Sequence, residues 1–212
     1  MENQTASINL TIENGGAAVG KPAPRFSLPS IQGQSISLKD YAGKKNVLLW
    51  FSRGFTCPFC RDFMENVVDG YGQLQQKNIE IIQIAPNIHH RAVSFFGDMA
   101  PPFPLICDPD KRLFATYGLG DDGILRAQRN TIASFSYAAR KGEFWKTTRA
   151  SAMDVFDRSF VRRLHHHALT AVNQAIVGID INGKITSKLD IGALESIPST
   201  PKMIQLLEPT VH

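Results

Sequence analysis

Three continuous apolar segments, each followed by a stretch with helical periodicity, constrain the fold of this chain more than any other feature. The segments cover residues 46–52, 79–86 and 103–108. Apolar runs of this length, bounded by turn residues, are typical of strands buried on both faces of a sheet. Strands that alternate with helices imply a parallel sheet with helices packed on its faces.

The helical stretches between these runs repeat apolar residues at steps of three and four. The first begins at Pro58 and passes through Gly70 and Gly72, which weaken its second half. A short second helix is expected around residues 91–99. The third begins at Pro109 and ends near Gly118, which fits the preference for proline at a helix start and glycine at its end.

A β-hairpin is predicted at each end of this alternating unit. Residues 18–46 contain Gly33 between two short alternating stretches. Residues 174–186 form two strands joined by Asn182-Gly183, a strong hairpin signal. The last hairpin adds antiparallel strands to the parallel core, and a closing helix follows at about 201–207. The predicted fold is therefore α/β, with a central mixed sheet flanked by helices.

Residues 121–172 interrupt this pattern before the last hairpin. A loop of about 52 residues is abnormal in such a fold, so we expect a helical insertion. Apolar residues at helical spacing indicate one helix around Leu125 to Phe135 and another from Met153 to Ala168. The segment contains nine Lys/Arg and five Asp/Glu, while the rest of the chain holds 14 of each. All of the net charge of +4 therefore lies in this insertion.

Several roles fit the basic insertion. It can be a lid over a functional site, a docking face for an acidic protein or a membrane-surface contact. The plainer alternative is a helical pair that packs on the core or forms the interface of a homodimer. A surplus of four charges is weak beside that of nucleic-acid-binding proteins, so no nucleic acid partner is expected.

The N-terminal residues 1–17 are polar and contain adjacent glycines, which predicts a disordered tail before a domain at 18–212. They show neither the basic nor the apolar region of a secretory signal. No apolar run approaches the roughly 20 residues that a membrane span needs. We therefore expect a cytoplasmic protein without a membrane span.

Cys57 and Cys60 form a C-x-x-C pair where the first strand meets the first helix. Pro58 suits the first helical position, which makes Cys57 the N-cap, facing the free amides at the helix start. Arg53 and Arg61 add positive charge nearby. These features stabilise a thiolate, the reactive form of cysteine, and we expect a lowered pKa. Residues three apart in a helical turn also lie within disulfide range.

The alternatives for the pair are a zinc site or two inert core cysteines. Zinc commonly takes four ligands from two such pairs, and the chain has no second C-x-x-C, so redox work is preferred. Cys107 lies in a predicted strand and is expected to be a buried small hydrophobe. Three consecutive helical residues cannot converge on one ion, so His165–His167 are not expected to bind metal. His89 and His90 follow a strand end, where active-site loops are common, but geometry is needed to assign them.

The sequence resembles the peroxiredoxin-like branch of the thioredoxin-fold superfamily, which includes the alkyl hydroperoxide reductase and thiol-specific antioxidant group. Four stretches carry the resemblance, at residues 19–52, 53–64, 103–119 and 177–185. The resemblance implies a thioredoxin-like fold and reduction of a hydroperoxide at the expense of an external thiol donor. No metal, flavin or nicotinamide site is visible in the sequence, so regeneration of the thiols is expected to depend on an external reductant.

Two departures from the family pattern bear on the site. Counted from Phe51, the peroxiredoxin pattern places Arg53 at its proline, Cys57 at its threonine and Cys60 at its reactive cysteine. Asn173 and Gln174 occupy the region where peroxiredoxins carry an arginine and thioredoxins a cis-proline. Helix capping thus favours Cys57 as the attacking thiol, and the family register favours Cys60. Both remain candidates, with Arg53, Thr56 and Pro58 as supporting residues.

The function expected from these features is hydroperoxide reduction through a cycle of Cys57 and Cys60 between dithiol and disulfide. One alternative is thiol–disulfide exchange without peroxidase activity, with a disulfide as substrate. Another is a redox-responsive binding protein, in which oxidation of the pair alters how the insertion docks on a partner.

Overall fold

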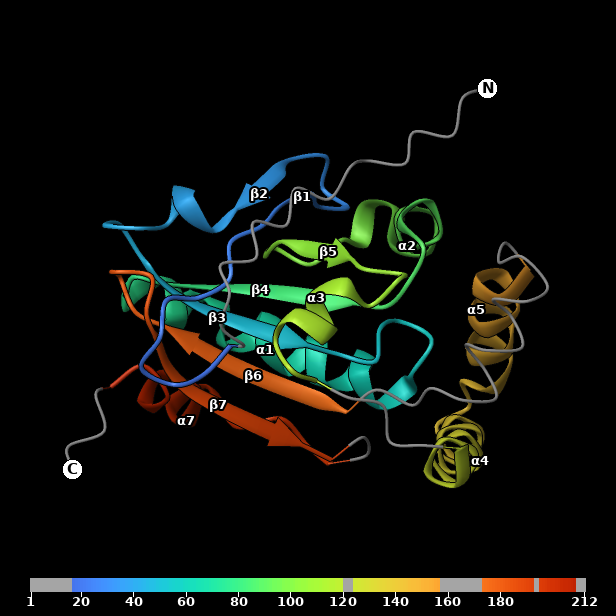
Figure 1. Ribbon diagram of the computed structural model, residues 1–212. Coiled ribbons are helices and arrows are strands. Elements are labelled where there is room, and N and C mark those ends of the chain that lie inside the picture. Colours follow the sequence, from blue (N-terminus) through green and yellow to red (C-terminus); the bar gives the residue numbers. More distant parts are fainter. Residues whose placement is uncertain (1–16, 120–123, 157–172, 193–194, 209–212) are drawn as a thin grey trace.

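A computed structural model describes residues 17–119, 124–156, 173–192 and 195–208 of the chain. Its centre is a five-stranded mixed sheet in the order β5-β4-β3-β6-β7 (Figure 1). The strands are β3 (Asn46–Phe51), β4 (Ile79–Ala85), β5 (Leu105–Cys107), β6 (Gln174–Ile179) and β7 (Ile185–Ile191). β3, β4 and β5 are parallel, β6 is antiparallel to β3, and β7 is antiparallel to β6. The predicted mixed sheet, with an antiparallel hairpin after a parallel core, is confirmed.

The apolar run of β3 lies in the middle of this sheet. Leu48 pairs with Ile81 of β4 on one side and with Gly178 of β6 on the other. Leu49 and Phe51 belong to one buried cluster, while Leu48 and Trp50 belong to a second. Alternate side chains of the strand thus fill the cores on both faces, which is why the run is apolar throughout.

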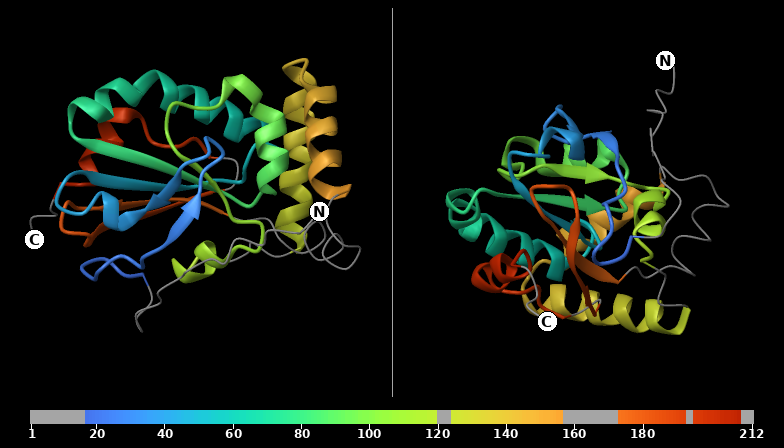
Figure 2. Two further views of the ribbon diagram at one scale, coloured as in Figure 1. Left: turned by 90° about the horizontal axis from the view of Figure 1, so that it is seen from above. Right: turned by 60° about the vertical axis from the view of Figure 1, so that its left-hand side comes forward.

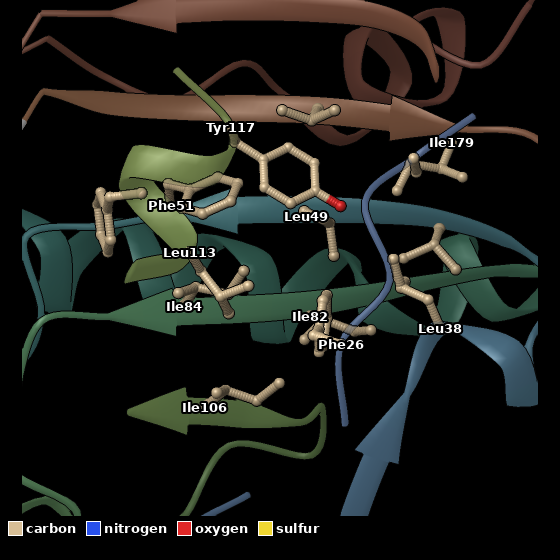
Figure 3. Close-up of a cluster of buried hydrophobic side chains, with 14 of the residues drawn as sticks. Phe26, Leu38, Leu49, Phe51, Ile82, Ile84, Ile106, Leu113, Tyr117 and Ile179 are labelled. Carbon is tan, nitrogen blue, oxygen red and sulfur yellow. The ribbon is translucent and has the colours of Figure 1, made fainter. Parts of the chain in front are cut away.

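The first cluster joins the sheet to the N-terminal hairpin and to α3 (Arg112–Thr116). The hairpin consists of β1 (Ser27–Pro29) and β2 (Ser35–Ser37), followed by the 3₁₀ turn η1 (Leu38–Asp40), and it confirms the sequence prediction. Figure 3 shows Tyr117 packed among these core side chains. Its buried hydroxyl donates to the carbonyl of Pro24 at 2.9 Å, which satisfies the polar end of the ring.

The second cluster contains residues of α1 (Pro58–Gln76), α2 (His89–Phe96), α5 (Phe144–Phe156) and α7 (Thr200–Gln205). A short 3₁₀ turn, η2 (Gly97–Met99), follows α2. The glycines expected to weaken α1 do not interrupt it. Gly70 has a packing reason, because a Cβ there would collide with Thr200 of α7.

The third predicted helix is shorter than expected, so its predicted start at Pro109 is wrong. α3 begins at Arg112, and Lys111 before it adopts a left-handed backbone conformation with φ of 55°. The buried carboxylate of Asp108 accepts the amides of Arg112 at 3.0 Å and Leu113 at 2.8 Å. Asp108 therefore satisfies the free amides at the helix start, and the chain turns between it and Arg112.

Two helices occupy the described part of residues 121–172. The predicted helix around Leu125 to Phe135 is α4 (Ile124–Arg140). The second is α5, which begins at Phe144 after a turn in which Gly142 has φ of 73° and which the sequence did not predict. Most of the helix predicted from Met153 to Ala168 lies outside the described residues, so it stays a prediction. α4 and α5 lie side by side at the end of the sheet from which the β3–α1 turn emerges (Figures 1 and 2).

Parts of the predicted domain layout lie outside the described residues. These are residues 1–16 of the expected tail and the C-terminal part of the insertion, with His165–His167. The division into a tail, a domain and an insertion therefore stays a prediction. Among the described helices, none is both long and apolar enough to cross a membrane.

Candidate active site

The two thiols lie on the turn that leads from β3 into α1. Cys57 is the N-cap of α1, with an extended backbone, and Pro58 occupies the first turn of the helix, as the sequence predicts. Cys60 lies one turn further on, with its side chain fully buried. The side chain of Cys57 is only 4% exposed, so both sulfurs lie below the surface.

A network of buried polar groups fixes the path of this turn. The hydroxyl of Ser52 accepts the amide of Gly54 at 3.2 Å and the side-chain amide of Gln83 at 2.9 Å. Oδ1 of Asn87 accepts the amide of Phe55 at 3.2 Å. Gly54 has φ of 83°, and a Cβ at this position would collide with Asn87. Only glycine therefore fits where the turn approaches the asparagine.

The environment of Cys57 favours its thiolate. A hydrogen bond from Cys60, the positive charge of Arg53 and the amides of Cys60 and Phe59 lower the pKa of Cys57 to about 6, against the opposing effect of burial. Nη1 of Arg53 lies 3.8 Å from the sulfur of Cys57. At neutral pH most of this thiol is therefore ionised.

Cys60 is in the opposite state. Burial, its hydrogen bond to Cys57 and the negative charge on that residue raise the pKa of Cys60 well above its usual range. Its sulfur also lies 3.7 Å from Oε1 of Gln174, the first residue of β6, within range of a hydrogen bond to sulfur. The pair thus combines one thiolate with one buried, protonated thiol.

Arg61 does not play the predicted role of adding charge at Cys57. Nη1 donates to the carbonyl of Phe55 at 2.9 Å, and Nη2 donates to Glu143 at 2.7 Å and to Thr147 at 2.9 Å. The side chain is buried and points toward α5, so Arg53 supplies the charge that acts on Cys57. Arg61 instead connects the thiol turn to α5 and the turn before it.

A second set of contacts joins the start of α1 to α4. The ring of Phe59, between the two cysteines, stacks on Tyr137 with centroids 4.1 Å apart. The Tyr137 hydroxyl donates to Asp62, and Lys141 pairs with the same carboxylate at 2.7 Å. The segment 124–156 thus contacts Phe59, between the two thiols, and Arg61 and Asp62, which follow Cys60.

Other residues singled out from the sequence lie elsewhere or contribute less. Thr56 is half-buried in the turn. Cys107, at the end of β5, is half-buried rather than fully buried as expected, and it packs against the second cluster. His89 begins α2, and its buried Nδ1 has no hydrogen-bond partner among the described residues. No group of three metal-ligating side chains occurs among the residues that the structure describes.

Gln174 and Asn87 are the site residues that sequence reasoning missed as partners of the thiol turn. The family pattern marks Gln174 only as lying in the region of an expected arginine or proline, and nothing nearby in the sequence links it to Cys60. Asn87 directly follows the apolar run of β4 and its closing proline. A polar residue at the carboxyl end of a parallel strand is a signal that could have identified it.

A groove of about 810 Å³ lies beside the site, between α1, α2, η2 and α5. Its walls carry apolar side chains, among them Phe95, Met99 and Trp145, and the charged side chains of Lys146 and Arg149. Arg61 lines the groove and also holds the carbonyl of Phe55, whose ring stacks on Phe95 at 4.6 Å. Neither thiol is among the described residues that line it.

Comparison with known proteins places this geometry in context. Residues 19–133 match the AhpC/TSA family. A Mycobacterium tuberculosis protein named "Putative peroxiredoxin" is 28% identical over 99 residues, which are 47% of this chain and 62% of that protein. The thiol-disulfide oxidoreductase ResA of Bacillus anthracis is 31% identical over 103 residues, 48% of this chain and 58% of that protein. The chain thus spans about three fifths of the length of these relatives.

Solved structures show the same fold. The reduced 2-Cys peroxiredoxin of Plasmodium vivax superposes with a TM-score of 0.60 at 15% sequence identity. The superposition covers 89% of this chain and 79% of that chain. The expected thioredoxin-like fold of peroxiredoxins is therefore confirmed.

Proposed function

The chain belongs to the AhpC/TSA family, and from this premise we propose that it is a thiol-dependent oxidoreductase that reduces hydroperoxides through Cys57 and Cys60. The observation that carries the proposal is the position of Cys57 at the N-cap of α1, with Nη1 of Arg53 3.8 Å from its sulfur and the buried Cys60 one turn further on. This environment lowers the pKa of Cys57 and raises that of Cys60. It favours Cys57 as the attacking residue, in agreement with helix capping and against the family register. Cys60 is then the resolving residue.

In the first step the Cys57 thiolate attacks the terminal oxygen of a hydroperoxide. An S–O bond forms and the O–O bond breaks, and the leaving oxygen takes a proton to become an alcohol or water. Cys57 becomes a sulfenic acid, so the sulfur is oxidised by two electrons and the peroxide is reduced by two. The charge of Arg53, 3.8 Å from the sulfur, stabilises the thiolate that begins this step.

In the second step Cys60 attacks the sulfur of the sulfenic acid. An S–S bond forms and the hydroxyl group leaves with the proton of Cys60 as water. Residues three apart in the first turn of a helix fall within the Cα separation of a disulfide. Two thiol groups of an external reductant then restore the dithiol and are themselves oxidised to a disulfide.

A second candidate function is thiol–disulfide exchange. The similarity to ResA, a thiol-disulfide oxidoreductase, favours it. The same thiolate would attack a disulfide sulfur of the substrate, and Cys60 would then resolve the mixed disulfide. Here no peroxide is consumed, so the two candidates differ in the oxidant that they accept.

The experiment measures hydroperoxide consumption with dithiothreitol as reductant for the wild type, Cys57→Ser, Cys60→Ser and the double variant. We expect Cys57→Ser to be as inactive as the double variant. Cys60→Ser keeps the attacking thiolate but lacks the resolving thiol, so after peroxide treatment without reductant mass spectrometry should find its Cys57 as a sulfenic acid, whereas dithiothreitol can resolve that acid directly. Cys107→Ser is the matched control and should retain the wild-type rate, because Cys107 lies on β5, which β4 separates from the strand that leads into the thiol turn.

The peroxidase proposal would be refuted if the wild type consumed hydrogen peroxide and organic hydroperoxides no faster than the double variant does. Reduction of insulin disulfides by such a protein would instead support exchange. A redox-responsive binding protein would be silent in both assays. A cytoplasmic location also belongs to the proposal, because a chain with three cysteines and one C-x-x-C pair suits a reducing compartment.

A further inference from the structure

We propose that Gln174 is a positioning residue whose side-chain oxygen accepts a hydrogen bond from the Cys60 thiol whenever Cys57 carries no negative charge, and that it thereby sets how readily Cys57 ionises. The inference rests on the proposed function, in which Cys57 attacks and Cys60 resolves. It assigns a role to a residue that lies 114 positions from Cys60 in the sequence.

The contact between Gln174 and Cys60 is built by the sheet. β6 pairs with β3 so that Ala175 faces Phe51, which places Gln174 beside the turn that follows β3. Both Gln174 and Cys60 have fully buried side chains. Oε1 of the glutamine lies 3.7 Å from the sulfur, within range of a hydrogen bond to sulfur.

The orientation of the Gln174 amide follows from its other partner. Nε2 donates to the backbone carbonyl of Glu195 at 3.4 Å. Glu195 is itself held by Gly192, whose carbonyl accepts the Glu195 amide and whose amide donates to the Glu195 carboxylate. A flipped amide would place two acceptor oxygens against each other, so the carbonyl oxygen of Gln174 faces Cys60.

The thiol of Cys60 has one proton and two acceptors, namely the sulfur of Cys57 and the oxygen of Gln174. A charged acceptor forms the stronger hydrogen bond, so the Cys60 thiol donates to Cys57 when Cys57 is ionised. When Cys57 is protonated, a buried thiol still needs a partner, and Gln174 provides it. The charged groups that act on Cys60 are Cys57 and Arg53, while β6 contributes the uncharged Gln174 and the Glu195 carboxylate is bound to Gly192.

Gln174 therefore stabilises the state in which Cys57 is uncharged. Gln174→Met removes the acceptor at nearly constant volume, so the pKa of Cys57 should fall. A net hydrogen bond of ordinary strength corresponds to roughly a three- to tenfold change in an equilibrium constant, or about half a pH unit to one unit. The expected shift is thus opposite to the one that loss of Arg53 would cause.

The test follows the rate of Cys57 alkylation by iodoacetamide against pH in the reduced Cys107→Ser protein, which requires neither peroxide nor reductant. Gln174→Met should move the midpoint to lower pH by the amount given above. Gln32→Met is the matched control, because Gln32 also uses its side-chain amide for structural hydrogen bonds, to Pro101 and Phe103. It should leave the midpoint unchanged.

The same substitution in a Cys60→Ala background separates positioning from a general effect on the fold. Without the Cys60 thiol, Cys57 and Gln174 no longer compete for the same hydrogen-bond donor, so Gln174→Met should no longer move the midpoint of Cys57 alkylation. An unchanged midpoint in the first background, or an equal shift in both, would overturn the inference. If Gln174→Met does not fold, Gln174→Asn, which withdraws the oxygen by one methylene, is measured in the same two backgrounds.

The outcomes also distinguish this inference from the proposed function. A protein that shows the expected shifts but consumes no peroxide contradicts the peroxidase proposal and leaves the role of Gln174 intact. If the protein is an active peroxidase and Gln174→Met leaves the pH midpoint of Cys57 alkylation unchanged, only the inference about Gln174 is contradicted.

Discussion

Arg53 and Cys57 face each other within one turn of the chain, with Nη1 of the arginine 3.8 Å from the sulfur. The arginine occupies the position at which the family pattern has a proline, four residues before the thiol. Its guanidinium is the positive side chain that lowers the pKa of Cys57, whereas Arg61 is committed to Phe55, Glu143 and Thr147. The two arginines near the thiols therefore have separate roles, one electrostatic and one structural.

Replacement of Arg53 by methionine should raise the pKa of Cys57 by about one unit, because the thiolate loses a nearby opposite charge. Alkylation of Cys57 against pH measures the shift. Arg53→Lys keeps the positive charge but loses the planar guanidinium with its several donors, so it should raise the pKa of Cys57 by a smaller amount. Arg25→Met is the control, since Arg25 is exposed and distant in sequence, and a shift as large in that variant would contradict the assignment.

Peroxide reduction should depend on pH through the ionisation of Cys57. The thiolate is the reactive form, and its pKa is lowered to about 6. The second-order rate of the first step should therefore rise with pH up to about 7 and stay level above it. Stopped-flow measurement of the Cys60-containing protein with excess peroxide checks this. A rate that still rises between pH 8 and 9 would indicate a thiol of ordinary pKa.

Removal of the buried Arg61 side chain should loosen the packing of α5 on the thiol turn. Arg61→Met loses charge-assisted hydrogen bonds to Glu143 and Thr147, and we expect a loss of about 2–3 kcal/mol in the free energy of unfolding. Urea denaturation measures it. The alkylation midpoint of Cys57 should hardly move, because Arg61 does not supply the charge at that thiol.

Arg149→Met is the matched control for this prediction. Arg149 lies on α5 and is exposed, and it forms no ion pair with any residue described in the structure. Its loss should change the free energy of unfolding by less than about 0.5 kcal/mol. If both substitutions lowered the free energy of unfolding equally, the hydrogen bonds of Arg61 to Glu143 and Thr147 would not be a specific link between the thiol turn and α5.

Two glycines should respond to alanine in opposite directions. Gly54→Ala forces a side chain into a backbone with φ of 83° and against Asn87, so we expect a loss of at least about 2 kcal/mol together with slower reaction of Cys57. Gly72→Ala lies in the interior of α1 with open space around it, and it should stabilise the protein by about 0.5–1 kcal/mol. Thermal denaturation of the two variants compares them directly.

The sequence predicts elements well where the signal is local. The strands of the core were found because each is a continuous apolar run, and the cap at Cys57 was found because Pro58 follows it. The start of α3 was misplaced because proline at 109 is a typical helix start, while the carboxylate of Asp108 reaches over a turn to cap Arg112 instead. α5 was not predicted, because the apolar spacing considered in the second half of the insertion begins only at Met153.

The parts of the site that the sequence did not predict are contacts between distant residues. Arg61 meets Glu143 across 82 positions, and Cys60 meets Gln174 across 114. No periodicity or motif connects such pairs, because their proximity is created by the packing of helices and by strand order. The position of Cys57 at the start of α1 could be predicted from the sequence, but the distant partners of the thiol turn required the fold.

The order of the strands also determines how the chain can be divided. The family match ends at residue 133, and a fragment that ended there would keep both cysteines. It would lack β6, which pairs with β3 along one full side and carries Gln174. The central strand of the sheet would become an open edge, and such edges recruit other chains. The matched segment is therefore expected to aggregate when expressed alone, although it contains the complete C-x-x-C motif.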